Sequence, residues 1–496
     1  MAIVLKARHI KLSFGDRKIL DFPEFTFSEG ERIGLIGDNG SGKTTLLRLL
    51  VGDLQPDKGS CTRFYELNYF AQIADVDQSA HPGGQALREW RVSPMVGCPV
   101  VSGGEQTRLR LAELDFDPEQ IILADEPTTN LDAAGISLLI GKLTVVRTFI
   151  LVSHDRSVLN AVCNKIVEIR NEQLISYPGN YDDYVMQKQE EKKRCRREYD
   201  QYTTELAQLN QAYKQKKQQA EKVRRRPPGI SSSEARMRDF VATSRSFGGK
   251  QKGMARAAES IQSRMNHLEV KAKPEESFVI RPDFSMTHPP VSNIVISVAN
   301  LSFAYDNHLV FQNTSFTIKN RSRVALIGPN GAGKSTLLNL IFNGDKSIFI
   351  APGVRFGYFR QKLDDLDLQA TVYENVRLMS VQREPVMRSI LARLGFSAAS
   401  LTKPVSVLSG GERIRLAFAR LFVSDCNVLL LDEPTSFLDI ASIEQIQSLF
   451  ASYEGTLVFA SHDRSFAAAI STDLLMLQDQ QISTFAGNPA DYWQSG

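Results

Sequence analysis

No apolar run in this sequence approaches the roughly 18 residues that a membrane-spanning helix requires, although 42% of its 496 residues are hydrophobic. The first residues, Met1 to Lys6, continue into a strand-like pattern and do not form a cleavable secretory signal. The sequence therefore predicts a cytoplasmic protein with no membrane partner. A chain of 496 residues is also too long for one ordinary core, so two or three domains are expected.

Cysteines are few and scattered along the chain. The five cysteines are odd in number and include no Cys-x-x-Cys pair; they are Cys61, Cys98, Cys163, Cys195 and Cys426. This pattern argues against a zinc ribbon and against a disulfide framework. It is typical of a protein that works in a reducing cytosol.

Positive charge is concentrated in one segment. Residues 188–273 hold 22 Lys and Arg against 10 Asp and Glu, a net charge of +12, whereas the rest of the chain holds 37 against 46, a net charge of −9. Such a segment predicts contact with nucleic acid or another polyanion. A solvated pair of charged helices is the alternative interpretation.

The chain contains an internal repeat. The segment Gly37–Thr44 (GDNGSGKT) recurs 291 residues later as Gly328–Ser335 (GPNGAGKS). Three further motifs recur in the same order, namely SGGE at 102 and 409, DEPT at 125 and 432, and SHDR at 153 and 461. One type of domain is therefore used twice, and we predict an α/β fold with P-loop domains at residues 1–185 and 291–496.

The spacer at residues 186–290 is predicted to be a long helical hairpin. Apolar residues recur at alternating steps of three and four from Tyr199 to Val223 and again from Met254 to Leu268, as in a coiled coil. Pro227-Pro228-Gly229 ends the first helix, a short helix starts at Ser231, and Gly248-Gly249 is expected to break the chain again. We therefore predict two antiparallel helices with a tip at about 224–249.

Each eight-residue repeat has the pattern Gly-x-x-x-x-Gly-Lys-Ser/Thr and lies between an apolar strand and a leucine-rich stretch that predicts a helix. That context is typical of a P-loop, in which backbone N–H groups and a helix N-terminus surround phosphate oxygens. Lys43 and Lys334 are expected to reach the β- and γ-phosphates of ATP, and Thr44 and Ser335 to offer a hydroxyl to Mg²⁺. The predicted ATP-binding residues of the loops are Gly37, Asp38, Asn39, Gly40, Ser41, Gly42, Lys43, Thr44 and Thr45, with Gly328, Pro329, Asn330, Gly331, Ala332, Gly333, Lys334, Ser335 and Thr336.

An apolar strand ending in an acid follows in each copy. Asp125 and Asp432 end these strands and are predicted to hold Mg²⁺ through its water shell. The next residues, Glu126 and Glu433, are placed to polarise the water that attacks ATP, which makes them the predicted catalytic carboxylates. A purely structural acid is the alternative at these two positions.

One histidine follows a further apolar strand in each copy. His154 and His462 both precede Asp-Arg, and they are predicted to contact the γ-phosphate as catalytic groups. A lone histidine in such a place is more often a hydrogen-bonded core residue. The repeated placement favours the catalytic interpretation.

These motifs together resemble the ATP-binding cassette (ABC) superfamily, and the resemblance covers both copies. It implies that Gln72 and Gln361 lie near Mg²⁺ and the attacking water, and that Phe14 and Tyr305 stack on adenine. It also implies that the signature sequence of one copy caps the ATP held by the other, as an ATP sandwich within one monomer. The signature residues are Ser102, Gly103, Gly104 and Glu105, with Ser409, Gly410, Gly411 and Glu412.

Departures from the family pattern are mild. Thr129-Asn130 and Ser436-Phe437 stand where soluble relatives usually have Asn-His, and no catalytic group is removed. We therefore predict that both composite sites hydrolyse ATP to ADP and phosphate. This prediction depends most on the loop geometry around Asp132 and Asp439.

Two copies, no membrane domain and a basic helical spacer resemble the F subfamily (ABC-F), as does Tyr177–Tyr184 before the spacer. The resemblance implies ribosome binding at the tRNA exit site in the ATP state, with the spacer near peptidyl-tRNA, large-subunit ribosomal RNA and the peptidyl-transferase centre. Hydrolysis would then permit release. DNA is not an expected partner.

The first copy is shorter than the second, because Gln72 to Ser102 spans 30 residues and Gln361 to Ser409 spans 48. Housekeeping ABC-F translation factors usually carry an inserted arm in that stretch. Its absence, with the long tip, resembles the antibiotic-resistance branch of Msr, Vga and Lsa proteins, which dislodge ribosome-targeting drugs. Met237 and Phe240 are predicted near the drug site, unless they only pack the tip. The predicted RNA-binding residues are Arg224, Arg225, Arg226, Arg236, Arg238, Arg245, Lys250 and Lys252.

Three alternatives remain open at this stage. The chain resembles an ABC-F translation factor without drug protection, although such factors usually carry the arm. An ATPase subunit of a drug exporter would leave the basic spacer without a task. A DNA-repair ATPase with paired cassettes is disfavoured by the missing Cys-x-x-Cys motifs.

Overall fold

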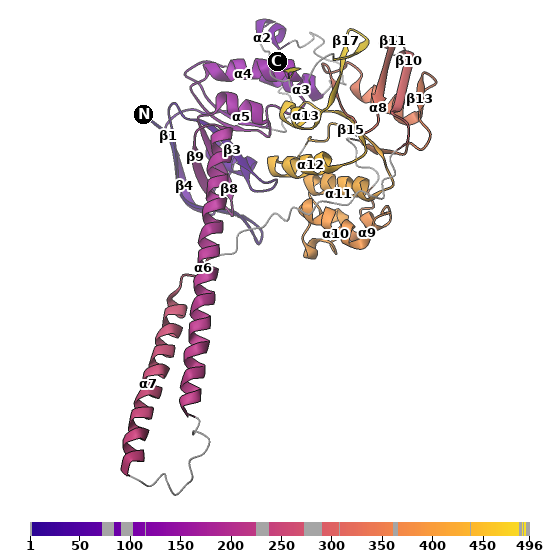
Figure 1. Cartoon of the computed structure of the whole chain (residues 1–496). Helices are drawn as coiled ribbons and strands as arrows, with labels where there is room; N and C mark the ends of the chain where they lie inside the picture. Colours follow the sequence, from indigo (N-terminus) through magenta and orange to yellow (C-terminus); the bar gives the residue numbers. More distant parts are fainter. Residues whose placement is uncertain are drawn as a thin grey trace. The chain divides into compact units, whose positions relative to one another are not determined.

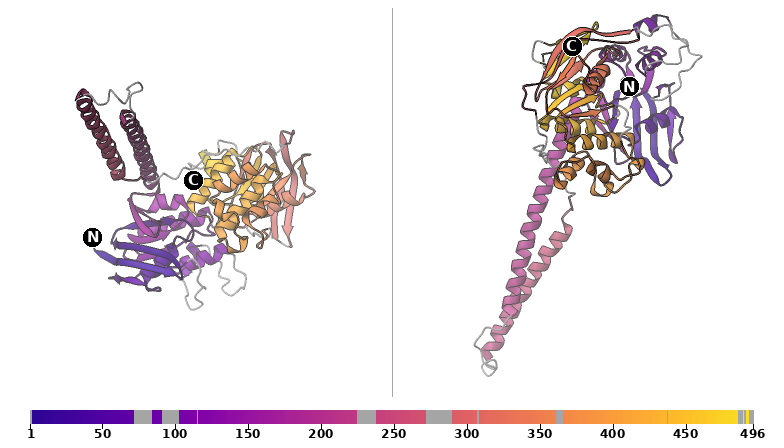
Figure 2. Two further views of the ribbon diagram at one scale, coloured as in Figure 1. Left: turned by 90° about the horizontal axis from the view of Figure 1, so that it is seen from below. Right: turned by 90° about the vertical axis from the view of Figure 1, so that its right-hand side faces the viewer.

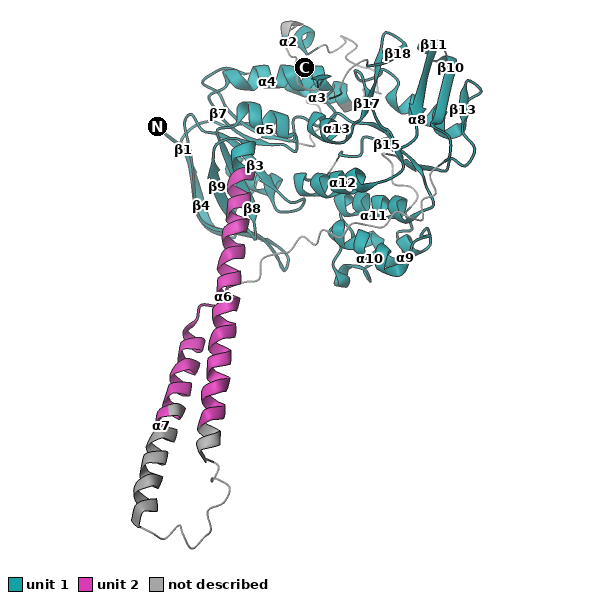
Figure 3. Cartoon of the chain, viewed as in Figure 1, with its two compact units in different colours: residues 1–184, 278–496 teal, residues 185–277 magenta. Residues whose placement is uncertain are grey.

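The computed structural model describes residues 2–71, 84–90, 103–114, 116–224, 238–271, 290–306, 308–360, 366–436, 438–485, 489 and 491–492. They divide into two compact units (Figure 3). The first unit consists of residues 1–184 and 278–496, and it holds both copies of the repeat. The second unit, residues 185–277, holds most of the spacer.

Both copies contain the same series of strands (Figure 1). In the first copy these are β1 (Ile3–Phe14), β2 (Arg17–Ser28), β3 (Arg32–Gly37), β4 (Lys58–Arg63), β5 (Asn68–Phe70), β6 (Ile121–Asp125), β7 (Thr148–Val152), β8 (Lys165–Arg170) and β9 (Gln173–Pro178). In the second copy they are β10 (Ile294–Tyr305), β11 (His308–Lys319), β12 (Arg323–Ile327), β13 (Ile348–Ile350), β14 (Phe356–Phe359), β15 (Val428–Asp432), β16 (Thr456–Ala460), β17 (Asp473–Gln478) and β18 (Gln481–Thr484).

The strands form two sheets in each copy. A three-stranded antiparallel sheet has the order β2-β1-β4 in the first copy and β11-β10-β13 in the second. A six-stranded sheet has the order β5-β6-β7-β3-β8-β9 or β14-β15-β16-β12-β17-β18, and only its last strand is antiparallel. Because β3, β6 and β7 are parallel neighbours, their carboxyl ends lie at one edge, where ligands bind in open α/β sheets.

Helices connect and cover these sheets. The first copy contains α1 (Lys43–Val51), α2 (Gly84–Glu89), α3 (Gly103–Ala112), α4 (Ala133–Val145) and α5 (Arg156–Val162). The second contains α8 (Lys334–Asn343), α9 (Val372–Arg377), α10 (Glu384–Arg393), α11 (Gly410–Val423), α12 (Ile440–Ser452) and α13 (Arg464–Ile470), with short 3₁₀ turns at Ala398–Ser400 and Val405–Val407. Each copy has its own hydrophobic core, in which the central strands are almost fully buried. The predicted fold class is confirmed.

The spacer forms two long helices, α6 (Tyr181–Arg224) and α7 (Arg238–His267), which run side by side in every view (Figure 2). Their direction is antiparallel, because Glu205 pairs with Arg264 at 3.0 Å while Glu198, earlier in α6, pairs with Lys271, beyond α7, at 3.9 Å. Among the predicted seam residues with described side chains, Ala258 is buried and Lys216 is exposed. The others are partly buried, namely Tyr199, Tyr202, Leu206, Leu209, Tyr213, Ile261, Met265 and Leu268.

One prediction about the spacer is wrong. The break expected at Gly248-Gly249 does not occur, because α7 continues through both glycines over its 30 residues. A glycine in a helix interior costs only about 1 kcal/mol relative to alanine, which a long helix can absorb. The helix start expected at Ser231 lies outside the described residues. None of the described helices combines the length and apolar composition needed to cross a membrane.

Candidate nucleotide-binding sites

Both P-loops connect the end of a central strand to the start of a helix. β3 ends at Gly37 and α1 begins at Lys43, with Gly42 in the left-handed region at φ 102°. A Cβ atom at Gly42 would lie 2.6 Å from Cγ2 of Ile19, so only glycine fits this turn. The second loop has the same geometry, with Gly333 at φ 93° before α8. The backbone N–H groups at each helix start are therefore available to phosphate oxygens.

The two P-loop lysines are buried and lie over their own loops. Lys43 Nζ donates to the carbonyl oxygens of Gly37 at 2.7 Å and Asp38 at 3.2 Å. Lys334 Nζ donates to Gly328 at 2.8 Å and Pro329 at 3.1 Å. Burial lowers the pKa of Lys43, and the nearby carboxylates, Glu126 first among them, oppose that shift. Each loop therefore holds a desolvated ammonium where phosphate charge is expected.

A hydroxyl and a carboxylate meet behind each loop. Ser335 Oγ donates to Asp432 Oδ1 at 2.9 Å, and Thr44 makes the equivalent hydrogen bond to Asp125. The second oxygen of Asp125, Oδ2, is buried without a hydrogen-bond partner, and burial raises the pKa of this carboxyl group. Hard oxygen ligands with a spare acceptor fit Mg²⁺ and its water shell. No cluster of three or more potential metal-binding side chains occurs in the described part of the chain, so a metal here would rely on these pairs and on phosphate oxygens.

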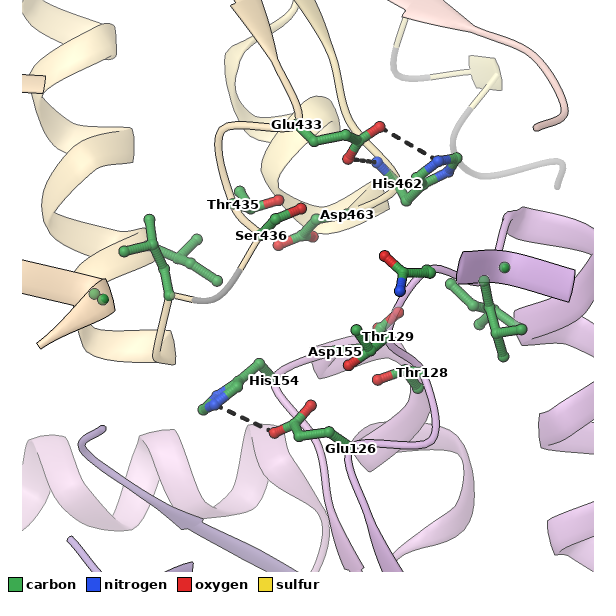
Figure 4. A pocket seen from close by; sticks show the side chains of 18 of the residues that line it. Glu126, Thr128, Thr129, His154, Asp155, Glu433, Thr435, Ser436, His462 and Asp463 are labelled. Atoms are coloured by element: carbon green, nitrogen blue, oxygen red, sulfur yellow. Dashed lines mark hydrogen bonds and ion pairs between the residues drawn. The ribbon is translucent and has the colours of Figure 1, made fainter. Parts of the chain in front are cut away.

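The predicted catalytic glutamates each contact the predicted histidine of the same copy (Figure 4). Oε1 of Glu126 lies 3.2 Å from Nε2 of His154, and Oε1 of Glu433 lies 3.3 Å from Nε2 of His462. Both glutamates have a positive φ, 51° for Glu126 and 50° for Glu433. That conformation is uncommon for a residue with a side chain, and such strain is concentrated at functional sites.

Burial controls the protonation of these pairs. It raises the pKa of Glu126 and of Glu433 to about 8, with Lys43 and Lys334 acting in the opposite direction. Burial also lowers the pKa of His154 to about 3, so this imidazole is neutral at physiological pH. The pKa of His462 is lowered to about 4 for the same reason. At physiological pH each imidazole is therefore neutral, and each carboxyl group largely keeps its proton.

Residues of both copies line one cleft of about 1430 Å³. The two Glu–His pairs face this cleft from opposite sides (Figure 4). Predicted site residues on its wall are Phe14, Asn39, Gly40, Gly42, Lys43, Thr44, Thr45, Gly104, Glu105, Asp125, Glu126 and His154 from the first copy, with Tyr305, Asn330, Gly331, Gly333, Lys334, Ser335, Thr336, Ser409, Gly410, Gly411, Glu433 and His462 from the second. Phe14 and Tyr305 are each 54% exposed, so part of each ring is accessible to a ligand.

The signature glycine of the first copy meets the opposite P-loop closely. A Cβ atom at Gly104 would lie 2.7 Å from the carbonyl oxygen of Asn130 and 3.1 Å from Nδ2 of Asn330 in the second P-loop. Nδ2 of Asn330 also donates to the carbonyl oxygen of Asn130 at 3.1 Å. In the second copy Ser409 caps α11 and forms a capping box with Glu412. A helix N-terminus from one copy therefore points toward the loop of the other.

Asp132 and Asp439, whose loops the sequence pointed to without placing them among the site residues, join the two copies. Asp439 caps α12 by accepting from Ser442 N at 2.8 Å, and its other oxygen accepts from the backbone N–H of Asn39 in the first P-loop at 2.9 Å. Asp132 caps α4 and accepts from the backbone N–H of Asn330 in the second P-loop. Against the effect of burial, the hydrogen bond from Arg108 and then those from Gly135 and Asn330 lower the pKa of Asp132. The hydrogen bonds from Ser442 and Asn39 lower the pKa of Asp439 in the same way. The available signal was an Asp seven residues after Asp125 and Asp432 in both copies, just before a predicted helix.

Several predicted residues cannot be placed. Gln72, Gln361 and Ser102 lie outside the described residues, as do Arg225, Arg226, Arg236 and Met237 of the spacer. Arg224 ends α6, and Arg238, Phe240, Arg245, Lys250 and Lys252 belong to α7. Of these six, only Lys252 has a described side chain, and it is exposed.

Comparison with known proteins agrees with this geometry. The family model of the ABC transporters matches residues 20–83 and 311–436, which contain both P-loops. The ribosome protection protein VmlR of Bacillus subtilis is 30% identical over 97% of this chain and 88% of its own. The erythromycin resistance ATP-binding protein MsrA of Staphylococcus epidermidis is 32% identical over 96% of this chain and 98% of its own.

A solved structure shares the fold. The RNase-L Inhibitor structure superimposes with a TM-score of 0.62, and the match covers 97% of this chain and 88% of that one at 17% identity. That likeness shows the fold alone. The sequence identities to VmlR and MsrA extend over nearly the whole chain and therefore show the family. With the P-loops, the acid-ended strands and the signature sequences, these comparisons lead to one conclusion: the chain belongs to the ABC-F subfamily of ATP-binding cassette ATPases.

Proposed function

We propose that this ATPase binds the ribosome and protects it from antibiotics. The observation that carries the proposal is the likeness over nearly the whole chain to VmlR, whose name is that of a ribosome protection protein, and to MsrA, named for erythromycin resistance. The spacer supports it, because residues 188–273 carry a net charge of +12. Phosphate contacts by Lys and Arg supply most of the affinity and register for RNA.

In each proposed site, one P-loop holds ATP and the signature sequence of the other copy covers it. Lys43 or Lys334 leaves its loop carbonyls to neutralise the β- and γ-phosphates. Thr44 with Asp125, and Ser335 with Asp432, would hold Mg²⁺, which supplies charge neutralisation to the phosphates when it is bound.

Hydrolysis then follows from the Glu–His pair of each site. The oxygen of a water molecule bonds to the γ-phosphorus while the bond from that phosphorus to the bridging oxygen breaks, giving ADP and phosphate. Glu126 or Glu433, whose pKa would fall beside bound Mg²⁺, orients this water as a carboxylate and takes its proton. His154 or His462, held by that glutamate, contacts the γ-phosphate oxygens. Asp439 and Asp132 each link the P-loop of the opposite copy to their own copy. Loss of the γ-phosphate after hydrolysis would remove the contacts that this phosphate makes across the two copies.

Within the proposal, the ATP-bound protein occupies the tRNA exit site, where α6 and α7 reach toward peptidyl-tRNA and the peptidyl-transferase centre. The tip of the hairpin, with Met237 and Phe240 near the drug site, then dislodges the drug, and hydrolysis releases the protein. The domain limits at residues 185 and 290 and the RNA contacts of the spacer are part of this proposal.

Cell-free translation inhibited by a ribosome-targeting drug tests the proposal. Purified protein with ATP is expected to restore synthesis. A variant in which residues 225–237 are replaced by a Gly-Ser linker of equal length should keep its ATPase activity and lose the rescue. Rescue that survives this replacement would contradict the proposed mechanism, and failure of the unmodified protein to rescue with macrolides, lincosamides and pleuromutilins would contradict drug protection itself.

A further inference from the structure

The hairpin beside each P-loop carries a different residue in the two copies. In the first copy Phe14 pairs with Arg17 across the turn from β1 to β2. In the second copy Tyr305 pairs with His308 across the turn from β10 to β11. Arg17 and His308 therefore occupy equivalent positions, each opposite the aromatic residue that is expected to stack on adenine.

Among the residues described in the two hairpins, Arg17 alone holds a P-loop through a charged side chain. Nη2 of Arg17 donates to the carbonyl oxygen of Gly40 at 3.1 Å, and a Cβ atom at Gly40 would lie 3.7 Å from that nitrogen. At Gly331, the equivalent residue of the second loop, the described residues place nothing within 4 Å of a Cβ atom. His308 lines the cleft instead. The backbone of the two glycines is otherwise alike, with φ 76° at Gly40 and 81° at Gly331.

The hydrogen bond from Arg17 acts on the part of the loop that binds phosphate. The carbonyl of Gly40 and the N–H of Ser41 belong to one peptide unit, so a donor fixed on the carbonyl also fixes that N–H. A guanidinium group keeps its charge at all physiological pH values, whereas a histidine does not carry a fixed charge. Arg17 makes no ion pair with any described residue, so no neighbouring carboxylate neutralises the charge that it brings to the loop.

We propose that Arg17 is a positioning residue for the first ATP site, which holds Gly40 and adds positive charge beside the phosphates, and that the second site lacks this device. The two composite sites therefore differ in their affinity for nucleotide through a side chain outside the recognised motifs. The inference rests on the nucleotide sites proposed above and is independent of any role on the ribosome.

Titration of the full chain with Mg²⁺ and a methylanthraniloyl ATP analogue, site by site, tests this inference. Lys334→Ala leaves only the first site competent to bind, and Lys43→Ala leaves only the second. In the first background, Arg17→Ala is expected to raise Kd about fivefold, the upper range for an exposed charge interaction. Arg17→Lys should recover part of the affinity, because it restores the charge without the planar fork. The matched change His308→Ala in the second background should alter Kd by less than about twofold.

Salt distinguishes a charge effect from a general loosening of the hairpin. The difference between the Arg17→Ala variant and its parent should shrink at about 1 M salt, where the screening length falls to about 3 Å. Equal shifts for Arg17→Ala and His308→Ala, no shift for either, or a loss that salt does not change would overturn the inference. Analogue binding that persists when Lys43 and Lys334 are both replaced by alanine would instead contradict the assignment of the nucleotide sites. Melting temperatures of the variants report whether the fold is kept.

Discussion

Replacing both catalytic glutamates by glutamine is expected to stabilise the protein, and more so at pH 8 than at pH 6. Burial raises the pKa of Glu126 and Glu433 from 4.5 to about 8 in the folded chain. Between these values the folded protein keeps a proton that the unfolded chain releases, so the free energy of unfolding falls as pH rises. Glutamine cannot ionise, so the double variant does not undergo this loss.

The size of the effect follows from the two pKa values. One pKa unit corresponds to about 1.4 kcal/mol, and the folded glutamate still holds most of its proton up to pH 8. From pH 6 to pH 8 the wild-type chain therefore loses about 2 kcal/mol for each glutamate relative to the variant. For a unit of this size that corresponds to a difference of several degrees in melting temperature.

Thermal melting at pH 6, 7 and 8 in chelator, without nucleotide, measures this difference. Glu24→Gln is a suitable control, since Glu24 is exposed and its pKa is lowered through the hydrogen bond and charge of Lys6. That control should show no pH-dependent change in this range. A constant difference between wild type and the Glu126→Gln, Glu433→Gln variant from pH 6 to pH 8 would show that the two buried glutamates are not protonated in the folded chain.

Two substitutions test the contacts between the copies. Asp439→Ala removes both the cap of α12 and the acceptor for the N–H of Asn39. Loss of the cap should lower the free energy of unfolding by about 1 kcal/mol. Loss of the charged hydrogen bond should reduce ATP turnover about tenfold. Asp439→Asn keeps the cap, so a normal melting temperature with reduced turnover is expected; normal turnover in both variants would mean that Asp439 only caps its helix. Gly104→Ala places a methyl group against the carbonyl oxygen of Asn130 and against Nδ2 of Asn330 in the opposite P-loop. ATP turnover should fall at least tenfold while affinity for nucleotide at the first P-loop stays within about twofold; unchanged turnover would contradict close contact between Gly104 and Asn330.

The sequence was sufficient for the fold class and for most of the local chemistry, because these depend on short segments. A P-loop needs glycines, a lysine and a helix start at fixed spacing, and Gly42 and Lys43 follow that rule. An apolar strand ending in Asp125 is likewise a local pattern. The repeat then supplied a second example of each motif. The matching position of His462 favoured a catalytic role for His154 over that of an ordinary core histidine.

Features that depend on distant segments could not be read from the sequence. The hydrogen bond from Asn39 to Asp439 joins residues 400 positions apart, and neither side chain signals its partner. The bond from Arg17 to Gly40 depends on how a hairpin packs on a loop. The break wrongly expected in α7 shows the opposite limit, since local propensity at Gly248-Gly249 was overridden by the rest of the helix.

The central claim is that this ATPase acts on ribosomes in its ATP-bound state. Sedimentation of the Glu126→Gln, Glu433→Gln variant through a sucrose cushion with ribosomes, with ATP and with ADP, tests it most directly. We expect the variant to bind ribosomes stably with ATP and little with ADP, and to arrest translation in the same mixture. Equal sedimentation with both nucleotides, or recovery of the variant with membranes rather than ribosomes, would contradict it.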